Sequence, residues 1–379
     1  MLPYLFVFAI SIFSTYLAQL CYNRNNKFLF VLFSAVAILT PALLAGFRDS
    51  GIGTDTKVYV DDIWNQFKHI NSWGQFYKYY IDEDFDDIEF VYLVLNYIAS
   101  LFGRDVGLIY FLSNFVVVLL IYLAAFDNRE RVSMWFIMFV FLFGYYNQSL
   151  NLVRQSIALA MGVYFFKYLE NKQWIKLIIS LIIIKYTHNT GIFYIGFVGA
   201  YLLAVGKYKL KPLILLITLF CSVFIFLYFD FIVGFFVLSG ILPQKFLYYL
   251  SGDEVDYTSL FIFHFIISMI LLIIYIYNSK SDQKEELLSY AFLNLLGSIL
   301  ILTSLVSIWS FRVAFYFLFL SECLFLPRAF YIMKEKYKLE YLLMLVVTIF
   351  LIVTVWYKVI IVNNDNDTYP YNSEFLESF

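Results

Sequence analysis

Charged side chains are scarce in this chain. Only 14% of its 379 residues are Asp, Glu, Lys or Arg, whereas soluble domains carry about 25%. The 26 basic and 28 acidic residues leave a net charge of −2, so the chain lacks the basic field that nucleic-acid binding needs. These values exclude a soluble enzyme, a disordered protein and a nucleic-acid-binding protein.

Cysteine and histidine are also rare. The three cysteines, Cys21, Cys221 and Cys323, lie far apart, without the spacing of a disulfide framework or a metal site. We interpret them as small hydrophobic residues. Of the three histidines, we interpret His264 as a core residue and His69 as solvated. The sequence shows no Ser-His-Asp spacing, cysteine nucleophile, zinc motif or haem signature.

What the chain has in excess is apolar sequence. Hydrophobic residues make up 62% of it and aromatic residues 22%. The apolar residues come in blocks of about 20, the length of a helix that crosses a bilayer. The first block has no basic region before it and no small-residue cleavage site after it, so we interpret it as a retained span. The composition therefore predicts an all-α integral membrane protein.

We predict twelve transmembrane helices and both termini outside, because this orientation leaves most basic residues in the inner loops. The predicted spans are 2–20, 28–47, 106–126, 132–146, 152–169, 174–187, 190–206, 212–229, 258–277, 287–307, 311–327 and 340–362. The apolar stretch 88–103 is short for a span, and we expect it to be re-entrant or to lie in the outer leaflet. If it crossed, the first two spans would have to be inverted.

The chain is expected to form a single polytopic membrane domain, residues 1–379. Its largest polar segments are an outer loop at 48–105, which includes the re-entrant stretch, a second outer loop at 230–257 and an outer tail at 363–379. Helical periodicity inside the first loop predicts two short amphipathic helices at the membrane interface. Their apolar faces are Tyr59, Ile63, Phe67 and Ile70, and then Trp73, Phe76, Tyr77 and Tyr80, the second after a capping box of Ser72 and Gln75.

Arginines next to lipid are candidate ligand-binding residues, because a charge near hydrocarbon costs at least about 2.5–3.5 kcal/mol. Arg48 follows the second span, and Gly51 and Gly53 after it would let the backbone approach a bulky anion. Arg154 lies near a helix N-terminus, where its charge adds to the helix dipole unless an anion binds. Gln155 is a companion donor. For Arg48, interfacial anchoring is the alternative.

Arg312 and Tyr316 lie one helical turn apart in the late part of the chain. On one helix face they would present a cation and a phenol to the same ligand. A surface anchor is again the alternative.

Three titratable residues are candidates for acid-base chemistry. Asp55 either caps the first loop helix, together with Thr54, or acts as a general base on a hydroxyl. His188 lies in a turn between two predicted spans, and histidine suits proton transfer near neutral pH. Glu89 begins the apolar stretch 88–103, where it would contact a sugar hydroxyl or an arginine. The acidic run from Asp82 to Asp87 is interpreted as solvated surface, with metal binding as the alternative.

The run Arg48-x4-Gly53-Thr54-Asp55-x3-Tyr59 resembles the first-loop signature of the EpsG-like family of polysaccharide polymerases, which includes many Wzy-type O-antigen polymerases. Further motifs follow in the same order: Glu89, Arg154-Gln155-Ser156-Ile157-Ala158, His188-Asn189-Thr190-Gly191, Arg312-x3-Tyr316 and Tyr369-Pro370-Tyr371. One departure is Asn189-Thr190, where we would expect a serine.

The resemblance implies a GT-C-like membrane glycosyltransferase in the bacterial inner membrane, with its active site facing the periplasm. Its substrates would be oligosaccharide repeat units linked to undecaprenyl pyrophosphate. The growing glycan would be transferred from its lipid pyrophosphate to the non-reducing end of a new unit. Its partners would be membrane lipid and a chain-length regulator protein, and it would bind no nucleic acid.

Residue chemistry and resemblance together give a hypothesis for the site. Arg48, Arg154 and Arg312 bind the pyrophosphate, and Asp55 or His188 takes the proton of the acceptor hydroxyl. The residues expected to position sugars are Tyr59, Glu89, Gln155 and Tyr316. We expect no metal and no other cofactor, because the arginines supply the charge. An O-antigen ligase, a flippase or transporter for lipid-linked oligosaccharide and a membrane O-acyltransferase are the alternatives.

Overall fold

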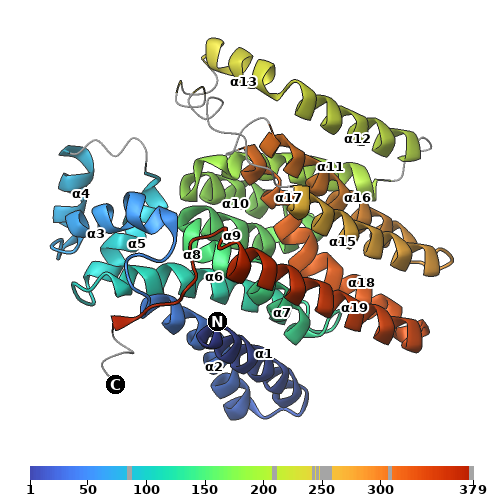
Figure 1. Ribbon diagram of the computed structural model, residues 1–379, viewed down its shortest axis with the longest axis horizontal. Coiled ribbons are helices and arrows are strands. Elements are labelled where there is room, and N and C mark those ends of the chain that lie inside the picture. The colour runs from blue at the N-terminus through green and yellow to red at the C-terminus, as the bar shows by residue number, and fades with distance from the viewer. Residues whose placement is uncertain are drawn as a thin grey trace. The chain divides into compact units, whose positions relative to one another are not determined.

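The computed structural model describes residues 1–82, 88–206, 211–240, 244, 247, 258–305 and 310–374. Within these ranges every regular element is a helix (Figure 1), as the all-α prediction requires. The chain divides into two compact units. Unit 1 is Met1–Gly191 with Ile349–Phe379, and unit 2 is Ile192–Thr348.

Unit 1 begins with two apolar helices, continues with the helices of the first loop and ends with the C-terminal tail. Its elements are α1 (Leu2–Asn23), α2 (Lys27–Gly46), the π-helix η1 (Thr56–Val60), α3 (Asp61–Phe67), α4 (Trp73–Asp82), α5 (Phe90–Ser100), α6 (Gly107–Asp127), α7 (Met134–Gly144), α8 (Tyr146–Asn151), α9 (Val153–Glu170), α10 (Trp174–Thr187), the start of η2 (Asn189–Phe193), the end of α19 (Lys338–Trp356) and η6 (Tyr357–Val362).

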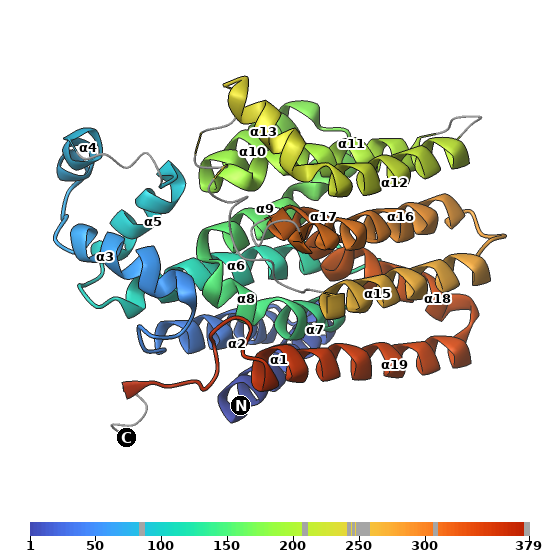
Figure 2. The same ribbon diagram turned by 45° about the horizontal axis from the view of Figure 1, so that its top comes forward.

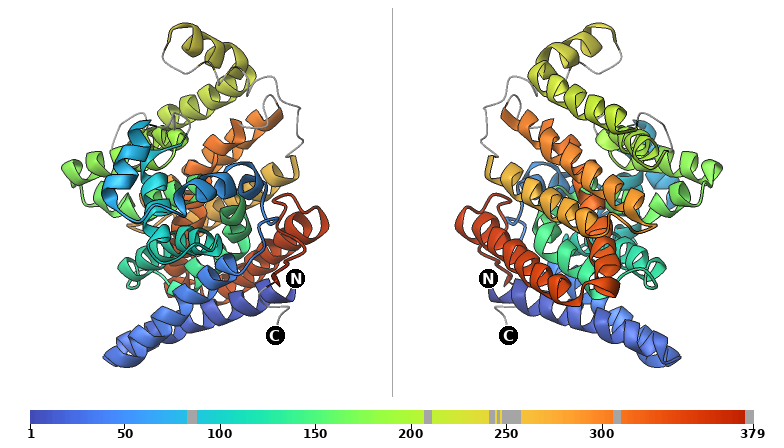
Figure 3. Two further views of the ribbon diagram at one scale, coloured as in Figure 1. Left: turned by 90° about the vertical axis from the view of Figure 1, so that its left-hand side faces the viewer. Right: turned by 90° about the vertical axis from the view of Figure 1, so that its right-hand side faces the viewer.

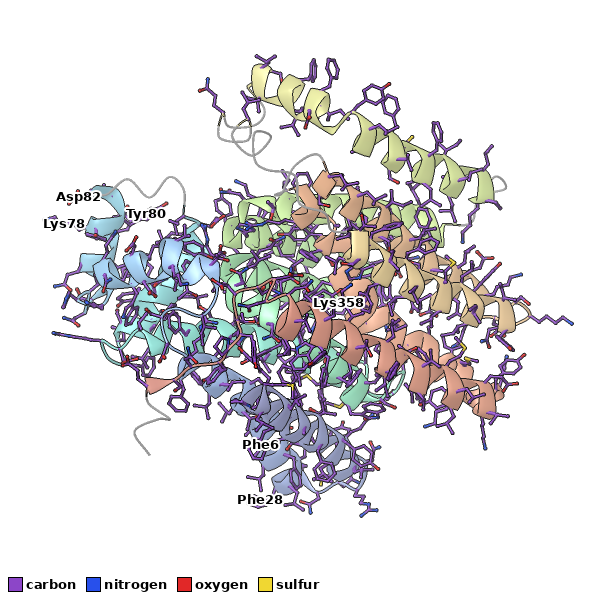
Figure 4. All side chains as sticks on the ribbon, viewed as in Figure 1. Phe6, Phe28, Lys78, Tyr80, Asp82 and Lys358 are labelled. Carbon is purple, nitrogen blue, oxygen red and sulfur yellow. The ribbon has the colours of Figure 1, made fainter. Side chains whose placement is uncertain are left out.

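The hairpin of α1 and α2 follows from its sequence (Figure 3). Asn25 adopts a left-handed conformation, φ 56°, which asparagine tolerates better than most residues. The side chain of Asn26 then caps α2 by accepting a hydrogen bond from the Leu29 amide at 3.1 Å. Phe6 and Phe28 project from this hairpin (Figure 4) and are 68% and 76% exposed. Such aromatic side chains suit a lipid environment.

Unit 2 consists of α11 (Tyr194–Val205), α12 (Lys211–Leu227), α13 (Phe229–Leu238), α15 (Thr258–Tyr277), α16 (Lys284–Ile301), η3 (Leu302–Leu305), η4 (Ser310–Val313), α17 (Phe315–Leu320), the π-helix η5 (Ser321–Phe325), α18 (Leu326–Lys336) and the first part of α19. Helices α15 and α16 pack side by side within it (Figure 2).

A buried polar network joins α15, α16 and η5. His264 is 2% exposed, so its interpretation as a core residue is confirmed. Its Nδ1 lies 2.6 Å from Oε1 of Glu322, and the Asn294 amide lies 3.4 Å from the same oxygen. Ser268 donates to Asn294 at 2.7 Å. Polar groups inside an apolar bundle are stabilised by such mutual hydrogen bonds.

Seven helices in the described ranges are long and apolar enough to cross a membrane. Helices α12 and α13, bent by 79° between Lys211–Ile225 and Asp230–Leu238, form an eighth if they are one span. The remaining predicted spans coincide with shorter helices, among them α7 and the segment Asn189–Val205. The structure is that of a helical membrane protein, and the number of twelve spans stays a prediction.

The apolar stretch 88–103 contains α5, which has 11 residues. At about 1.5 Å per residue, this helix is about half as long as the hydrocarbon core is thick. Its length favours the prediction that the stretch does not cross. The second outer loop, predicted at 230–257, lies largely outside the described residues.

The two amphipathic helices of the first loop are present as α3 and α4. The Ser72 hydroxyl accepts a hydrogen bond from the Gln75 amide, and the Gln75 side chain accepts one from the Asn71 amide, so the capping box is formed. The aromatic faces differ from the expectation, because Phe67 and Phe76 are 0% exposed and pack on each other. Side chains such as Tyr80 remain on the surface of α4 (Figure 4).

Hydrogen bonds tie the N-terminus, the first loop and the tail together. The Tyr4 hydroxyl donates to the Thr368 carbonyl at 2.7 Å, and the Gly53 amide donates to the Asp367 carbonyl at 2.8 Å. These three segments therefore lie on one side of the membrane, whereas the turn between α1 and α2 lies one span away.

We expect a membrane-impermeant maleimide to label Asn71→Cys and Asn372→Cys from the same side of the membrane. Asn23→Cys, at the other end of α1, should be labelled only from the opposite side. The measurement is labelling of intact spheroplasts compared with inverted vesicles, in a chain whose three native cysteines are replaced by alanine. Labelling of Asn71→Cys and Asn372→Cys from opposite sides would contradict the arrangement.

Candidate functional site

The carboxylate of Glu89 brings three separate segments of unit 1 together. Its Oε2 lies 2.7 Å from Nη1 of Arg154, and its Oε1 lies 3.0 Å from Nδ1 of His188. The main-chain amide of Asn189 donates to the same Oε1 at 2.8 Å. The side chain of Glu89 is only 5% exposed. Of the two contacts expected for Glu89, the structure has the contact with an arginine.

Local backbone structure presents these side chains to one another. Glu89 is extended and directly precedes α5, while Arg154 occupies the first turn of α9. His188 ends α10 in an extended conformation, φ −157° and ψ 133°, which turns the chain at this point. Gly191 permits the turn to close, since a Cβ there would lie 2.6 Å from the Ile184 carbonyl oxygen.

The surroundings of Glu89 keep it ionised. Burial alone would raise its pKa, but the hydrogen bond from His188, the charge of Arg154 and the Asn189 amide lower the pKa of Glu89 to about 2. An ionised carboxylate only accepts hydrogen bonds, so Nδ1 of His188 carries the proton of that contact. In the neutral imidazole, Nε2 is then the basic nitrogen. This arrangement fits a general base that is oriented by a carboxylate.

Arg154 also connects Glu89 to the first loop. Its Cζ lies 4.2 Å from the centre of the Tyr59 ring, in a cation–π contact. The Tyr59 hydroxyl donates to Oδ2 of Asp55 at 3.0 Å. Burial, and then the charge of Asp55, raise the pKa of Tyr59 well above its usual value, so the phenol stays protonated. Asp55, Tyr59, Arg154, Glu89 and His188 thus form a continuous chain of contacts, which we call the relay.

Asp55 is held by a residue that sequence reasoning missed. The side-chain oxygen of Asn151, at the end of α8, accepts hydrogen bonds from the Asp55 amide at 3.1 Å and from the Thr54 hydroxyl at 2.8 Å. The carboxylate of Asp55 makes no capping hydrogen bond to η1. The side chain of Asp55 therefore does not cap this helix. Its carboxylate accepts a hydrogen bond from Tyr59 instead.

Arg48 occupies a different environment, a group of buried contacts with Thr56 and Tyr110 that we call the Arg48 cluster. The residue is 5% exposed, and its Nη2 donates to the Thr56 hydroxyl at 3.3 Å. Its Cζ lies 4.5 Å from the centre of the Tyr110 ring. Among the described residues, no carboxylate oxygen lies within 4.0 Å of its guanidinium nitrogens, and Nε has no hydrogen-bond acceptor. Burial lowers the pKa of Arg48, as expected for a cation without a counter-ion.

The glycines after Arg48 differ in their surroundings. Gly53 has φ 89°, and a Cβ there would lie 2.7 Å from the Leu150 carbonyl oxygen. The close approach that this glycine permits is therefore to α8 of the same chain, rather than to an anion. Gly51 has no such constraint, because the nearest atom to its Cβ position is 3.9 Å away.

The C-terminal tail fastens the same loop. The Asp49 amide donates to the Asn372 carbonyl at 3.1 Å, and the Glu374 amide donates to the Asp49 carboxylate at 2.8 Å. The Tyr371 hydroxyl donates to the Leu44 carbonyl at 2.8 Å. The tail was noted in the sequence only for its resemblance to a family ending, and nothing in its residue pattern indicated this contact.

The remaining predicted site residues lie in two places. Gln155 is 2% exposed in the first turn of α9. Arg312 belongs to η4 and Tyr316, 1% exposed, to α17, both in unit 2, so their roles beside the relay stay predictions. In the acidic run, Asp82 ends α4, and residues 83–87 lie outside the described residues. No cluster of three metal-ligating side chains occurs in the described part of the chain.

We expect Gly53→Ala to lose most activity and to lower the melting temperature, because alanine is strained at φ 89° and its Cβ would collide with the Leu150 carbonyl. Gly51→Ala is the matched control, two residues away in the same loop, and should change stability by less than about 0.5 kcal/mol. The measurement is thermal unfolding in detergent together with glycan synthesis. Equal effects of the two substitutions would refute this explanation of Gly53.

A family model described as the EpsG family matches residues 31–373, which include every predicted site residue. No curated protein and no solved structure gives a significant match. The EpsG family is associated with Wzy-type polymerases, and it supports a role in polysaccharide biosynthesis by a membrane protein. Because the match extends over nearly the whole chain, this protein belongs to the EpsG family.

Proposed function

We propose that this protein is a polysaccharide polymerase of the bacterial inner membrane, with a GT-C-like mechanism. It transfers a growing glycan from undecaprenyl pyrophosphate to the non-reducing end of a new lipid-linked repeat unit at the periplasmic face. Family membership supports the reaction class. The observation that carries the proposal within the structure is the Arg48 cluster, in which a buried guanidinium has no carboxylate partner among the described residues.

Arg48 is suited to an anion because no carboxylate of the described residues compensates its charge. A buried guanidinium without a carboxylate is unfavourable, and a bound pyrophosphate supplies the missing charge. Arginine also matches phosphate oxygens with two parallel hydrogen bonds. Arg154 differs, because Glu89 already compensates its charge at 2.7 Å. We therefore assign pyrophosphate binding to Arg48, with Arg312 as a further candidate, and assign Arg154 to the relay.

The relay supplies the acid-base chemistry of the transfer. Nε2 of His188 takes the proton of the acceptor hydroxyl as its oxygen attacks the anomeric carbon of the donor sugar. The bond between that carbon and the pyrophosphate oxygen breaks, and the electron pair leaves with the lipid pyrophosphate. Glu89 stabilises the imidazolium that forms, as an orienting carboxylate does in other triads. Asp55, through Tyr59, is the alternative base.

Arg48 stabilises the leaving group in this scheme. Negative charge develops on the pyrophosphate as the glycosidic bond breaks, and a positioned guanidinium lowers the energy of that state. We propose a reaction without a metal ion, because the arginine charge serves this purpose. A ligase would use the same donor chemistry with a different acceptor, so the product identifies the reaction.

We expect the purified protein in liposomes to convert lipid-pyrophosphate-linked repeat units into a ladder of longer glycans, with or without chelator. Arg48→Lys should lose at least about tenfold in rate, because lysine cannot bind phosphate in the bidentate manner. The exposed Arg24→Lys is the matched control and should behave as wild type. Full activity of Arg48→Lys would contradict the role of Arg48. No ladder, from folded protein with verified substrate, would favour a ligase or flippase.

We expect His188→Gln to reduce kcat about 10²- to 10⁴-fold, the usual range for loss of a general base. The pH profile gives a second test. With a pKa of about 2, Glu89 stays ionised at every pH above about 4. Its protonation therefore causes no fall in kcat at acidic pH within that range. An acidic limb between pH 5 and 7 should therefore disappear in His188→Gln. If the limb persists unchanged, Asp55 or another group is the base.

A further inference from the structure

The hydroxyl of Tyr92 is a buried polar group without a partner. Tyr92 lies in the first turn of α5, where its amide bonds to the Glu89 carbonyl at 3.0 Å. The residue is 0% exposed, and its hydroxyl has no hydrogen-bond partner in the part of the chain that the structure describes. Burying an unpaired hydroxyl costs free energy, so such groups in folded proteins require an explanation.

The other tyrosines around Arg48 do not share this feature. Four other tyrosines interact electrostatically with Arg48, namely Tyr4, Tyr110, Tyr146 and Tyr371. The Tyr4 hydroxyl donates to the Thr368 carbonyl, and the Tyr110 hydroxyl donates to the Asp61 carboxylate. The Tyr146 hydroxyl donates to the Pro41 carbonyl, and the Tyr371 hydroxyl donates to the Leu44 carbonyl. Tyr92 alone in this group presents a free donor.

Tyr92 also lies beside the relay, because it contacts Tyr59. Its ring meets the Tyr59 ring edge-on at 6.2 Å, and Arg154 stacks on that same Tyr59 ring at 4.2 Å. The charges of Arg154 and Arg48 both act on the Tyr92 hydroxyl. A hydroxyl donor next to Tyr59, on which Arg154 stacks, is well placed for a ligand with several negatively charged oxygens.

Tyr92 remains a donor in these surroundings. Burial, as the largest effect, raises the pKa of Tyr92, so the hydroxyl keeps its proton at physiological pH. The side chain of Asn96, one turn further along α5, is near enough to lower the pKa of Tyr92, but it makes no hydrogen bond of 3.5 Å or less to the hydroxyl. Its amide donates instead to the Tyr92 carbonyl at 3.0 Å. The Oδ1 of Asn96 is likewise buried without a partner. A ligand with both phosphate oxygens and a hydroxyl would pair with this donor and this acceptor.

We propose that the Tyr92 hydroxyl donates a hydrogen bond to a phosphate oxygen of the donor substrate and binds the pyrophosphate together with Arg48. This inference rests on the proposed function. It adds a binding residue that neither the sequence motifs nor the family match indicates, and it places the pyrophosphate between Arg48 and the relay.

Inorganic pyrophosphate is the probe, and isothermal titration calorimetry in detergent is the measurement. Tyr92→Phe should bind pyrophosphate about 10- to 100-fold more weakly than wild type, the loss expected for one charge-assisted hydrogen bond. Without pyrophosphate, its melting temperature should equal or exceed that of wild type, because the substitution removes an unpaired polar group. A purely structural hydroxyl would give the opposite pattern.

Tyr122→Phe is the matched control. Tyr122 lies 12 residues after Tyr110 in α6, and its hydroxyl is 2.5 Å from the Ser34 hydroxyl. Loss of this hydrogen bond should lower the melting temperature and leave pyrophosphate binding unchanged. Suppose that the wild type binds pyrophosphate, that Arg48→Lys weakens this binding and that Tyr92→Phe leaves it unchanged. Then the inference about Tyr92 is wrong, and the proposed function stands. If wild type binds no pyrophosphate, the anion site of the proposed function fails and the inference fails with it.

Discussion

An ionised carboxylate that is removed from water needs compensating partners, and the candidate site of this protein depends on how Glu89 meets that need. A guanidinium from the start of α9, together with an imidazole and a main-chain amide from the end of α10, surrounds it. Because the carboxylate must keep these partners, it fixes the starts of α5 and α9 and the end of α10 relative to one another. The orientation of His188 follows from the same constraint.

Arg48 and Arg154, the two candidate site arginines of unit 1, illustrate how position decides chemistry. Both sit at helix ends beside apolar segments and looked equivalent as candidate anion contacts. Arg154 lies within 2.7 Å of a carboxylate and stacks on Tyr59, so it serves as a structural cation. Arg48 has tyrosines around it and a hydroxyl partner, but no described carboxylate near it. Only a cation of the second kind gains strongly from an anionic ligand.

The part of the chain that the structure describes contains two buried contacts between a histidine and a glutamate, and their surroundings differ. Glu322 meets His264 inside unit 2, beside an asparagine and serines that complete the hydrogen bonds of the core. Glu89 meets His188 where the histidine side chain is 13% exposed, and an arginine adds positive charge. The first arrangement holds helices together, whereas the second orients the histidine that we propose as the general base.

Composition and periodicity alone determined the helical membrane class, the short helices of the first loop and the capping box at Ser72, because these depend on neighbouring residues. The order of motifs identified Arg48, Asp55, Glu89, Arg154 and His188 as candidates. Only the tertiary structure showed that Glu89 joins Arg154 to His188 and that Asn151 and the tail hold the loop of Asp55. It also showed that the Tyr92 hydroxyl has no hydrogen-bond partner among the described residues. Such pairings are made across many residues of sequence. They depend on which groups burial brings together, which no local pattern records.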